Sequence, residues 1–288
     1  MKQVGNISIT PVIELEGPMF DPKRLLPDWS DDVLARHRDW MIPRQYDVAT
    51  KLLIMPIQSF LVRTAHHTIL VDGCFGNHKE RANPTFNMLS TPWLERLAAA
   101  GAAPEDIDFV MCTHLHGDHV GWNTRLDNGR WVPTFPNARY LFAETEWRHW
   151  DNESRRTLGP LAQHLQDSVL PVIDRGQADF VGTDHAIEDE VSFDPLPGHT
   201  PGHVGLHIKS QGAEAILTGD MMHHPIQCAY PDWSSGFCTD AKLSRKTRRG
   251  FLEKYADTDV TVAPAHFAAP TFGRIESRGT AFHFRFDD

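Results

Sequence analysis

Cysteine is scarce in this sequence of 288 residues, and no Cys-x-x-Cys pair occurs. The four cysteines are Cys74, Cys112, Cys228 and Cys238. Their even number would allow two disulfides, but disulfide-rich scaffolds concentrate cysteine in much shorter chains. The length of the chain and the scatter of the positions therefore predict free thiols in a reducing compartment.

Long hydrophobic runs and an excess of basic charge are also missing. No apolar run approaches the roughly 18 residues of a membrane-spanning helix, and residues 1–6 lack the features of a secretory signal. The formal net charge is −10, whereas binding to nucleic-acid phosphates needs basic patches. We interpret the basic cluster at residues 242–249 as a solvated helix face. The composition therefore predicts a cytoplasmic protein without a membrane or nucleic-acid partner.

The rest of the composition is that of an ordinary globular protein. Hydrophobic residues make up 41% and charged residues 23%, so a sizeable core is available. The length suits one large α/β domain or two small ones. Apolar runs flank a helical pattern at residues 91–101, which favours layers of strands and helices. Two long irregular segments, residues 16–46 and 221–241, are candidate lids over a site, and base rates favour a homodimer.

Four potential metal ligands fall within six residues: His114, His116, Asp118 and His119. An apolar run, residues 107–112, precedes them and is typical of a buried strand. Neutral imidazole is the commonest metal ligand in proteins, and a carboxylate beside it suits a borderline cation such as Zn²⁺. Three imidazoles and a carboxylate this close together would make a poor core. The segment therefore predicts a metal site at the end of a strand, where open α/β sheets present their sites.

Three more ligand-type residues follow, each just past a probable strand. They are His199 in a Pro/Gly turn, Asp220 after the run 215–217, and His266 after the run 260–263. Any one of these histidines alone would be an ordinary surface or core residue. The full order, His-x-His-x-Asp-His followed by His, Asp and His, resembles the ligand order of the metallo-β-lactamase superfamily of metallohydrolases. Seven matching positions in order are far more specific than a lone motif.

The resemblance implies an α/β fold and a dinuclear metal site. Members of the superfamily form a four-layer αββα sandwich, expected here as one domain over residues 1–288. The implied ligands are His114, His116 and His199 for one metal, Asp118, His119 and His266 for the other, and Asp220 for both. Zn²⁺ is the default ion, with Mn²⁺, Fe²⁺ or Co²⁺ as alternatives. Asp72 ends an apolar strand, as in the superfamily's Asp-Gly turn, and is expected to support the ligands from behind; a plain turn residue is the alternative.

The implied ligand set also narrows the reaction. Two ions can hold a hydroxide between them that attacks a carbonyl or phosphoryl group, while Asp118 accepts the proton. True β-lactamases lack an aspartate at the position of Asp220. The sequence resembles the branch of acyl-homoserine lactonases and methyl parathion hydrolases, which implies hydrolysis of a small-molecule lactone or carboxylic ester. An organophosphate triester hydrolase is the main alternative, and a thioesterase, a mononuclear iron dioxygenase and a non-catalytic binding protein are weaker ones.

Residues near the ligands complete the predicted site. His223 stands where the best-known homoserine lactonases carry a tyrosine, which makes it a candidate hydrogen-bond donor or general acid. A plain place in the pocket wall is the alternative for His223. Trp122, Met41, Phe75 and Phe237 are expected to line the substrate pocket, because an apolar and aromatic wall would suit an acyl or aryl group.

Overall fold

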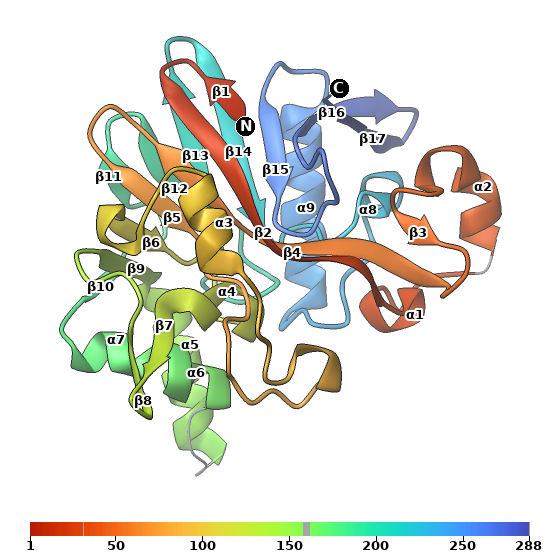
Figure 1. Cartoon of the computed structure of the whole chain (residues 1–288). Helices are drawn as coiled ribbons and strands as arrows, with labels where there is room; N and C mark the ends of the chain where they lie inside the picture. The colour runs from red at the N-terminus through yellow and green to blue at the C-terminus, as the bar shows by residue number, and fades with distance from the viewer. Residues whose placement is uncertain (31, 158–161, 288) are drawn as a thin grey trace.

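Two mixed β-sheets pack face to face, with helices on their outer faces (Figure 1). A computed structural model of the chain describes residues 1–30, 32–157 and 162–287. This layering confirms the predicted αββα sandwich. Asp31, which belongs to the candidate lid at residues 16–46, lies outside the described residues.

The first sheet comes from the N-terminal part of the chain. Its spatial order is β1 (Lys2–Val4), β2 (Ile7–Phe20), β4 (Leu52–Arg63), β5 (Thr68–Val71), β6 (Phe109–Met111), β9 (Arg139–Ala143) and β10 (Ala178–Val181), with β3 (Tyr46–Asp47) beside β4. Strand β4 is buried along most of its length because its sequence is almost continuously apolar. Strands β5, β6 and β9 are parallel, so their carboxyl ends meet at one edge. A separate hairpin is formed by β7 (Thr124–Asp127) and β8 (Arg130–Pro133).

The second sheet comes from the C-terminal part and follows chain order. Its strands are β11 (Ala186–Glu188), β12 (Val191–Pro195), β13 (Val204–Ser210), β14 (Ala213–Gly219), β15 (Thr261–Pro264), β16 (Gly273–Arg278) and β17 (Ala281–Phe286). Strands β14 and β15 are parallel, with helix α9 (Ala241–Tyr255) in the connection between them. Asp240 caps that helix by accepting from the backbone N–H groups of Lys242 and Leu243.

Apolar clusters join the layers. The helices are α1 (Pro22–Leu25), α2 (Asp32–Met41), α3 (Trp93–Ala99), α4 (Gly117–Val120), α5 (Glu144–Thr157), α6 (Gln163–Ser168), α7 (Leu170–Asp174), α8 (Ile226–Ala229) and α9, with short 3₁₀ turns η1 (Pro84–Phe86), η2 (Pro104–Asp106) and η3 (Gly121–Asn123). Between the sheets, Phe60 and Leu206 belong to one buried cluster. Trp93 of α3 packs on the outer face of the first sheet, and Phe251 of α9 on that of the second. Each such burial contributes about 1.5–3 kcal/mol.

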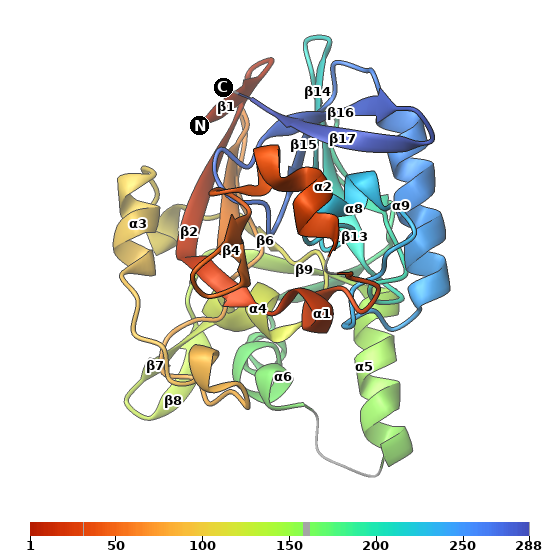
Figure 2. The ribbon, with the colours of Figure 1, turned by 90° about the vertical axis from the view of Figure 1, so that its right-hand side faces the viewer.

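The two candidate lids lie against each other. Residues 16–46 carry α1 and α2, and residues 221–241 carry α8; all three helices are in front in Figure 2. Phe20 and Phe237 meet with ring centroids 6.0 Å apart, and Ile226 is buried in the apolar cluster of α1 and α2. Their role as lids stays a prediction.

The described helices include none that is long and apolar enough to cross a membrane. The four cysteines are free, which confirms the prediction of free thiols. The cytoplasmic location and the homodimer stay predictions.

Candidate metal centre

The seven predicted ligands lie just beyond the carboxyl ends of strands. The segment after β6, which includes α4, carries His114, His116, Asp118 and His119. After strands β12, β14 and β15 come His199, Asp220 and His266. Because the parallel strands β14 and β15 end side by side, with Gly219 opposite Pro264, the last two predicted ligands are brought together from positions far apart in the chain.

The first cluster contains three imidazole nitrogens that face one another. His114 Nε2 lies 2.9 Å from His116 Nδ1 and 3.1 Å from His199 Nε2, and the latter two atoms are 2.9 Å apart. Asp220 Oδ2 completes the group at 3.3 Å from His199 Nε2 and 3.8 Å from His114 Nε2. All four ligand atoms lie within 4.8 Å of one another. This is the size and donor set of a metal site.

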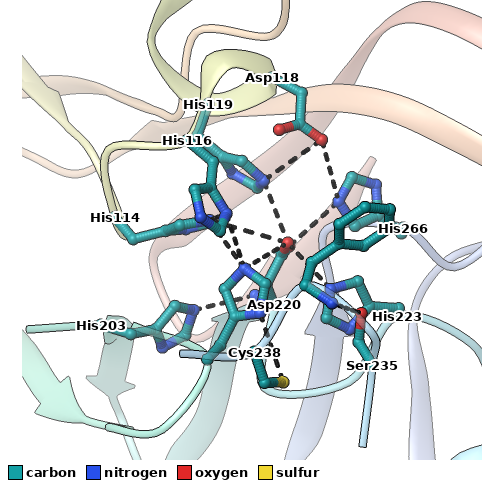
Figure 3. A network of polar contacts seen from close by, with 12 residues as sticks. His114, His116, Asp118, His119, His203, Asp220, His223, Ser235, Cys238 and His266 are labelled. Atoms are coloured by element: carbon teal, nitrogen blue, oxygen red, sulfur yellow. Dashed lines mark hydrogen bonds and ion pairs between the residues drawn. The ribbon is translucent and has the colours of Figure 1, made fainter. Parts of the chain in front are cut away.

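The second cluster meets the first at Asp220. Asp220 Oδ1 lies 3.3 Å from His119 Nε2 and 3.1 Å from His266 Nε2. Asp118 Oδ2 lies 3.8 Å from His119 Nε2 and 3.6 Å from His266 Nε2. Figure 3 shows the carboxylate of Asp220 between the two groups, with dashed contacts to both. One oxygen of Asp220 therefore faces each cluster, as a shared ligand requires.

The outer nitrogens of four of these rings are occupied by protein partners. The contacts are His119 Nδ1 to Asp72 Oδ2 (2.9 Å), His266 Nδ1 to the Pro56 carbonyl (3.0 Å), His114 Nδ1 to the Thr113 hydroxyl (3.1 Å) and His199 Nδ1 to the Cys238 sulfur (3.7 Å). An outward N–H sets the tautomer of the ring, so the inward nitrogen keeps its lone pair. The centre is thus lined by lone pairs and carboxylate oxygens.

This electron-rich centre fits cations. Among the described residues, His119 Nε2 and Asp220 Oδ1 are buried without a hydrogen bond of acceptable geometry. Burial lowers the pKa of His114 and of His199 well below the ordinary value, so these rings are neutral and able to bind a metal. Burial opposes charge at His119 too, but nearby carboxylates, Asp220 foremost, raise its pKa well above the ordinary value. The group therefore favours positive charge, and its donors fit two divalent ions.

Asp72 lies behind the ligand loop, where the sequence predicts it. Its carboxylate accepts hydrogen bonds from the backbone N–H of Thr113 (2.8 Å), from the Thr113 hydroxyl and from His119 Nδ1. Asp72 has a φ of +62°, a left-handed conformation that aspartate tolerates better than most residues. The carboxylate thereby orients a ring of the second cluster and the backbone that leads to the first.

Glu146, a residue that the sequence analysis missed, connects two ligand loops. It is 1% exposed. Its Oε1 accepts from the backbone N–H of Leu115 (3.2 Å) and from Trp150 Nε1 (2.8 Å), and its Oε2 accepts from the backbone N–H of Gly202 (3.0 Å). Leu115 lies between two predicted ligands, and Gly202 lies in the turn that carries His199. Glu146 therefore braces both sides of the first cluster.

A cavity of about 300 Å³ opens over the two clusters. Its apolar wall is formed by Phe20, Leu25, Met55, Phe75, Phe86 and Phe237, and the ligands that reach it are His116, Asp118, His199, Asp220 and His266. Phe75 and Phe237 thus lie where the sequence predicts them. Arg24 and Asn83 also line the cavity, although no sequence pattern had indicated either residue.

Trp122 and Met41 lie outside this cavity, which corrects their predicted place in the pocket. Trp122 is 3% exposed, stacks on Trp93 at 5.1 Å and donates through Nε1 to Glu14 at 2.6 Å. Glu14 also accepts from the backbone N–H of Phe75, so Trp122 supports the pocket wall from behind. Met41 is fully buried in the apolar cluster beneath α1 and α2.

Two further histidines near the centre differ in their environment. His203 donates through Nδ1 to the Leu196 carbonyl (3.0 Å) and accepts at Nε2 from the backbone N–H of Asp220 (2.9 Å). A Cβ at Gly219 would lie 2.7 Å from that nitrogen, so the close approach requires glycine. His223 lines the cavity, with Nε2 3.2 Å from Asp220 Oδ2. Neither of its ring nitrogens makes a hydrogen bond within the described part of the chain, so a donor is available beside the clusters.

The chain is similar in sequence to known metallohydrolases. The profile of the metallo-beta-lactamase superfamily matches residues 54–266, a range that includes all seven predicted ligands. The N-acyl homoserine lactonase of Bacillus thuringiensis is 24% identical over 179 residues, which are 58% of this chain and 64% of that protein. The N-acyl homoserine lactonase AiiB of Agrobacterium fabrum is 28% identical over 105 residues, 32% of this chain and 37% of that protein. The matched region thus spans less than two thirds of these relatives.

Solved structures are similar over the whole chain. The hydrolase AbOPH of the beta lactamase superfamily has a TM-score of 0.80 at 23% identity, covering 100% of this chain and 96% of its own. The dizinc quorum-quenching lactonase AidC, solved with a product, has a TM-score of 0.80 at 22% identity, with the same coverage. At these identities the likeness shows the fold, and it agrees with the sandwich described above.

Proposed function

The chain belongs to the metallo-beta-lactamase superfamily, and we propose that it is a dinuclear metal-dependent hydrolase that opens a lactone or cleaves a carboxylic ester. The observation that carries this proposal is the pair of ligand clusters that meet at Asp220. The proposed ligands are His114, His116 and His199 for one ion, Asp118, His119 and His266 for the other, and Asp220 for both. Zn²⁺ suits these nitrogen and carboxylate donors, with Mn²⁺, Fe²⁺ and Co²⁺ as alternatives.

The roles of the side chains follow from their places in the cavity. Two such ions, when bound, lower the pKa of water and polarise the substrate carbonyl. The Asp118 side chain is 21% exposed and lines the cavity, so its carboxylate can accept the proton that water releases as its oxygen adds to the carbonyl carbon. His223 lines the same cavity and can donate a proton to the alkoxide oxygen that leaves when the ester C–O bond breaks.

The cavity supports a small substrate with an acyl or aryl body. Its volume of about 300 Å³ lies at the small end of ligand pockets, and its apolar wall includes four phenylalanines. The named relatives are N-acyl homoserine lactonases, which supports a lactone as the first substrate to test.

Metal analysis combined with a substrate panel tests the proposal. We expect the purified chain to bind two equivalents of zinc and to hydrolyse members of a panel of N-acyl homoserine lactones, simple lactones and aryl esters. Removal of zinc by a chelator should abolish this activity, and adding zinc back should restore it. Protein with two zinc ions that cleaves none of the panel would overturn the proposal.

Adding methyl-paraoxon, thioesters and an oxygen-uptake assay to these measurements separates the alternative functions. Preferred turnover of methyl-paraoxon would indicate a phosphotriesterase, and preferred cleavage of thioesters would indicate a thioesterase. Oxygen uptake by iron-loaded protein would indicate a dioxygenase.

A further inference from the structure

Arg24, an exposed residue, brings a positive charge to the lining of the cavity, next to its apolar wall. Among the described residues that line the cavity, Arg24 is the one lysine or arginine, and its side chain is exposed to solvent. We propose that Arg24 binds a carboxylate of the substrate, remote from the bond that is cleaved. The inference rests on the proposed hydrolase function and adds a substrate class: lactones or esters whose acyl or aryl body carries an anionic group.

The guanidinium of Arg24 is available for a ligand. Asp21 caps the short helix α1 by accepting from the backbone N–H groups of Lys23 and Arg24 at 2.9 and 3.0 Å, which fixes the main chain at this point. Within residues 1–30, 32–157 and 162–287, the guanidinium itself makes no hydrogen bond or ion pair. Arg248 shows the contrast, because it is 1% exposed and donates to the carbonyls of Pro231 and Met221. Arg248 is structural, whereas the charge of Arg24 is free to act.

An aromatic wall connects this charge with the metal clusters. Phe75 stacks on Phe86 at 4.2 Å, Phe86 lies 5.9 Å from Phe20, and Phe20 lies 6.0 Å from Phe237. All four rings line the cavity that also contains Asp118 and Asp220. An apolar or aromatic body can therefore lie along the rings, with its ester at the clusters and its anion at the rim.

The guanidinium of Arg24 is chemically suited to bind a carboxylate. A guanidinium offers two parallel N–H groups that match the two oxygens of a carboxylate. The chain has a formal net charge of −10, but charges beyond about 8 Å are screened at physiological salt. The charge of Arg24, and not the net charge of the chain, therefore decides whether an anionic substrate is preferred over a neutral one at the rim. For an exposed pair about 4 Å apart, the attraction corresponds to roughly a five-fold preference.

Two isosteric esters test the inference: 4-acetoxybenzoate, which carries the anion, and 4-acetoxybenzamide, which is neutral. The rate of release of the phenol product, measured with the zinc-loaded protein, gives kcat/KM for each ester. We expect the anionic ester to be preferred, and Arg24→Gln to lower the ratio of the two kcat/KM values about five-fold. Lys23→Gln is the matched control: it removes the same charge from the same helix, but Lys23 does not line the cavity, so the ratio should stay unchanged.

The outcomes separate this inference from the hydrolase proposal. If both esters are cleaved and Arg24→Gln leaves their ratio at the wild-type value, the Arg24 inference is overturned while the hydrolase proposal stands. If neither ester is cleaved, the affinities of 4-hydroxybenzoate and 4-hydroxybenzamide for the zinc-loaded wild type and Arg24→Gln are measured by calorimetry. The inference is supported if Arg24→Gln weakens the binding of 4-hydroxybenzoate but not that of 4-hydroxybenzamide. It is overturned if wild type and variant bind 4-hydroxybenzoate equally well.

Discussion

Replacing Glu146 by glutamine tests whether one carboxylate holds the two loops of the first cluster together. The carboxylate is buried, and its oxygens accept hydrogen bonds from Leu115, Trp150 and Gly202. In Glu146→Gln an amide N–H₂ replaces one of the two oxygens, so at least one of these donors faces another donor. A hydrogen bond to a charged group contributes about 1.5–3 kcal/mol. We therefore expect the free energy of unfolding to fall by about 2 kcal/mol.

The same change should weaken one metal site more than the other. The backbone groups that Glu146 holds, at Leu115 and Gly202, belong to the two loops that carry His114, His116 and His199, the histidines of the first cluster. Loss of an outer partner of a metal ligand typically lowers metal affinity 10–100-fold. Competition with a chelator should thus show one zinc equivalent bound as in the wild type and one bound about 10–100-fold more weakly.

Glu144→Gln provides the matched control. Glu144 lies in the same first turn of α5, but its side chain is 50% exposed and pairs with Arg148, so its loss should cost less than about 1 kcal/mol. Urea unfolding and zinc competition are measured on both variants. The bracing role of Glu146 is refuted if Glu146→Gln matches Glu144→Gln in both measurements.

Three further changes probe the site and its surroundings. Asp220→Asn removes the charge shared by both clusters, so bound zinc should fall from two equivalents to one or none. The rate of hydrolysis should fall at least about 100-fold. Full zinc content and full activity in this variant would contradict a shared ligand. Cys238→Ala removes the sulfur that lies 3.7 Å from His199 Nδ1 and should weaken zinc binding about 10-fold, whereas Cys238→Ser keeps an acceptor and should restore most of it. Burial lowers the pKa of Lys79 from 10.5 to about 7. Between these two pH values the unfolded chain binds more protons than the folded chain, so the free energy of unfolding rises with pH. Lys79→Met should remove this rise between pH 7 and 9 in urea unfolding, and an unchanged pH dependence would contradict the reasoning.

Some of the site could be predicted because the information is local. The proposed ligands His114, His116, Asp118 and His119 lie within six residues, so their proximity needs no knowledge of the rest of the fold. His199, Asp220 and His266 could be recognised by their order and by the strand-like runs before them. The meeting of Asp220 and His266 depends on the pairing of Gly219 with Pro264 in neighbouring strands, which no single segment contains.

Trp122 shows where local reasoning fails. It follows the ligand segment directly, and adjacency in sequence suggested contact with substrate. The 3₁₀ turn η3 instead turns the ring toward Trp93 and Glu14, where it is buried. The prediction for Met41 was wrong for a related reason. Helix α2 places this side chain in the buried apolar cluster that it forms with α1, and not in the cavity.

By itself, the sequence determined the type, number and order of the proposed metal ligands, because these follow from residue identity and spacing. Only the tertiary structure decided which oxygen of Asp220 faces which cluster, and that Glu146 reaches partners 31 and 56 residues away. It also decided that Arg24 stands at the cavity rim. The physical reason is that the direction and burial of a side chain depend on the segments packed around it, and those segments come together only when the two sheets close on each other.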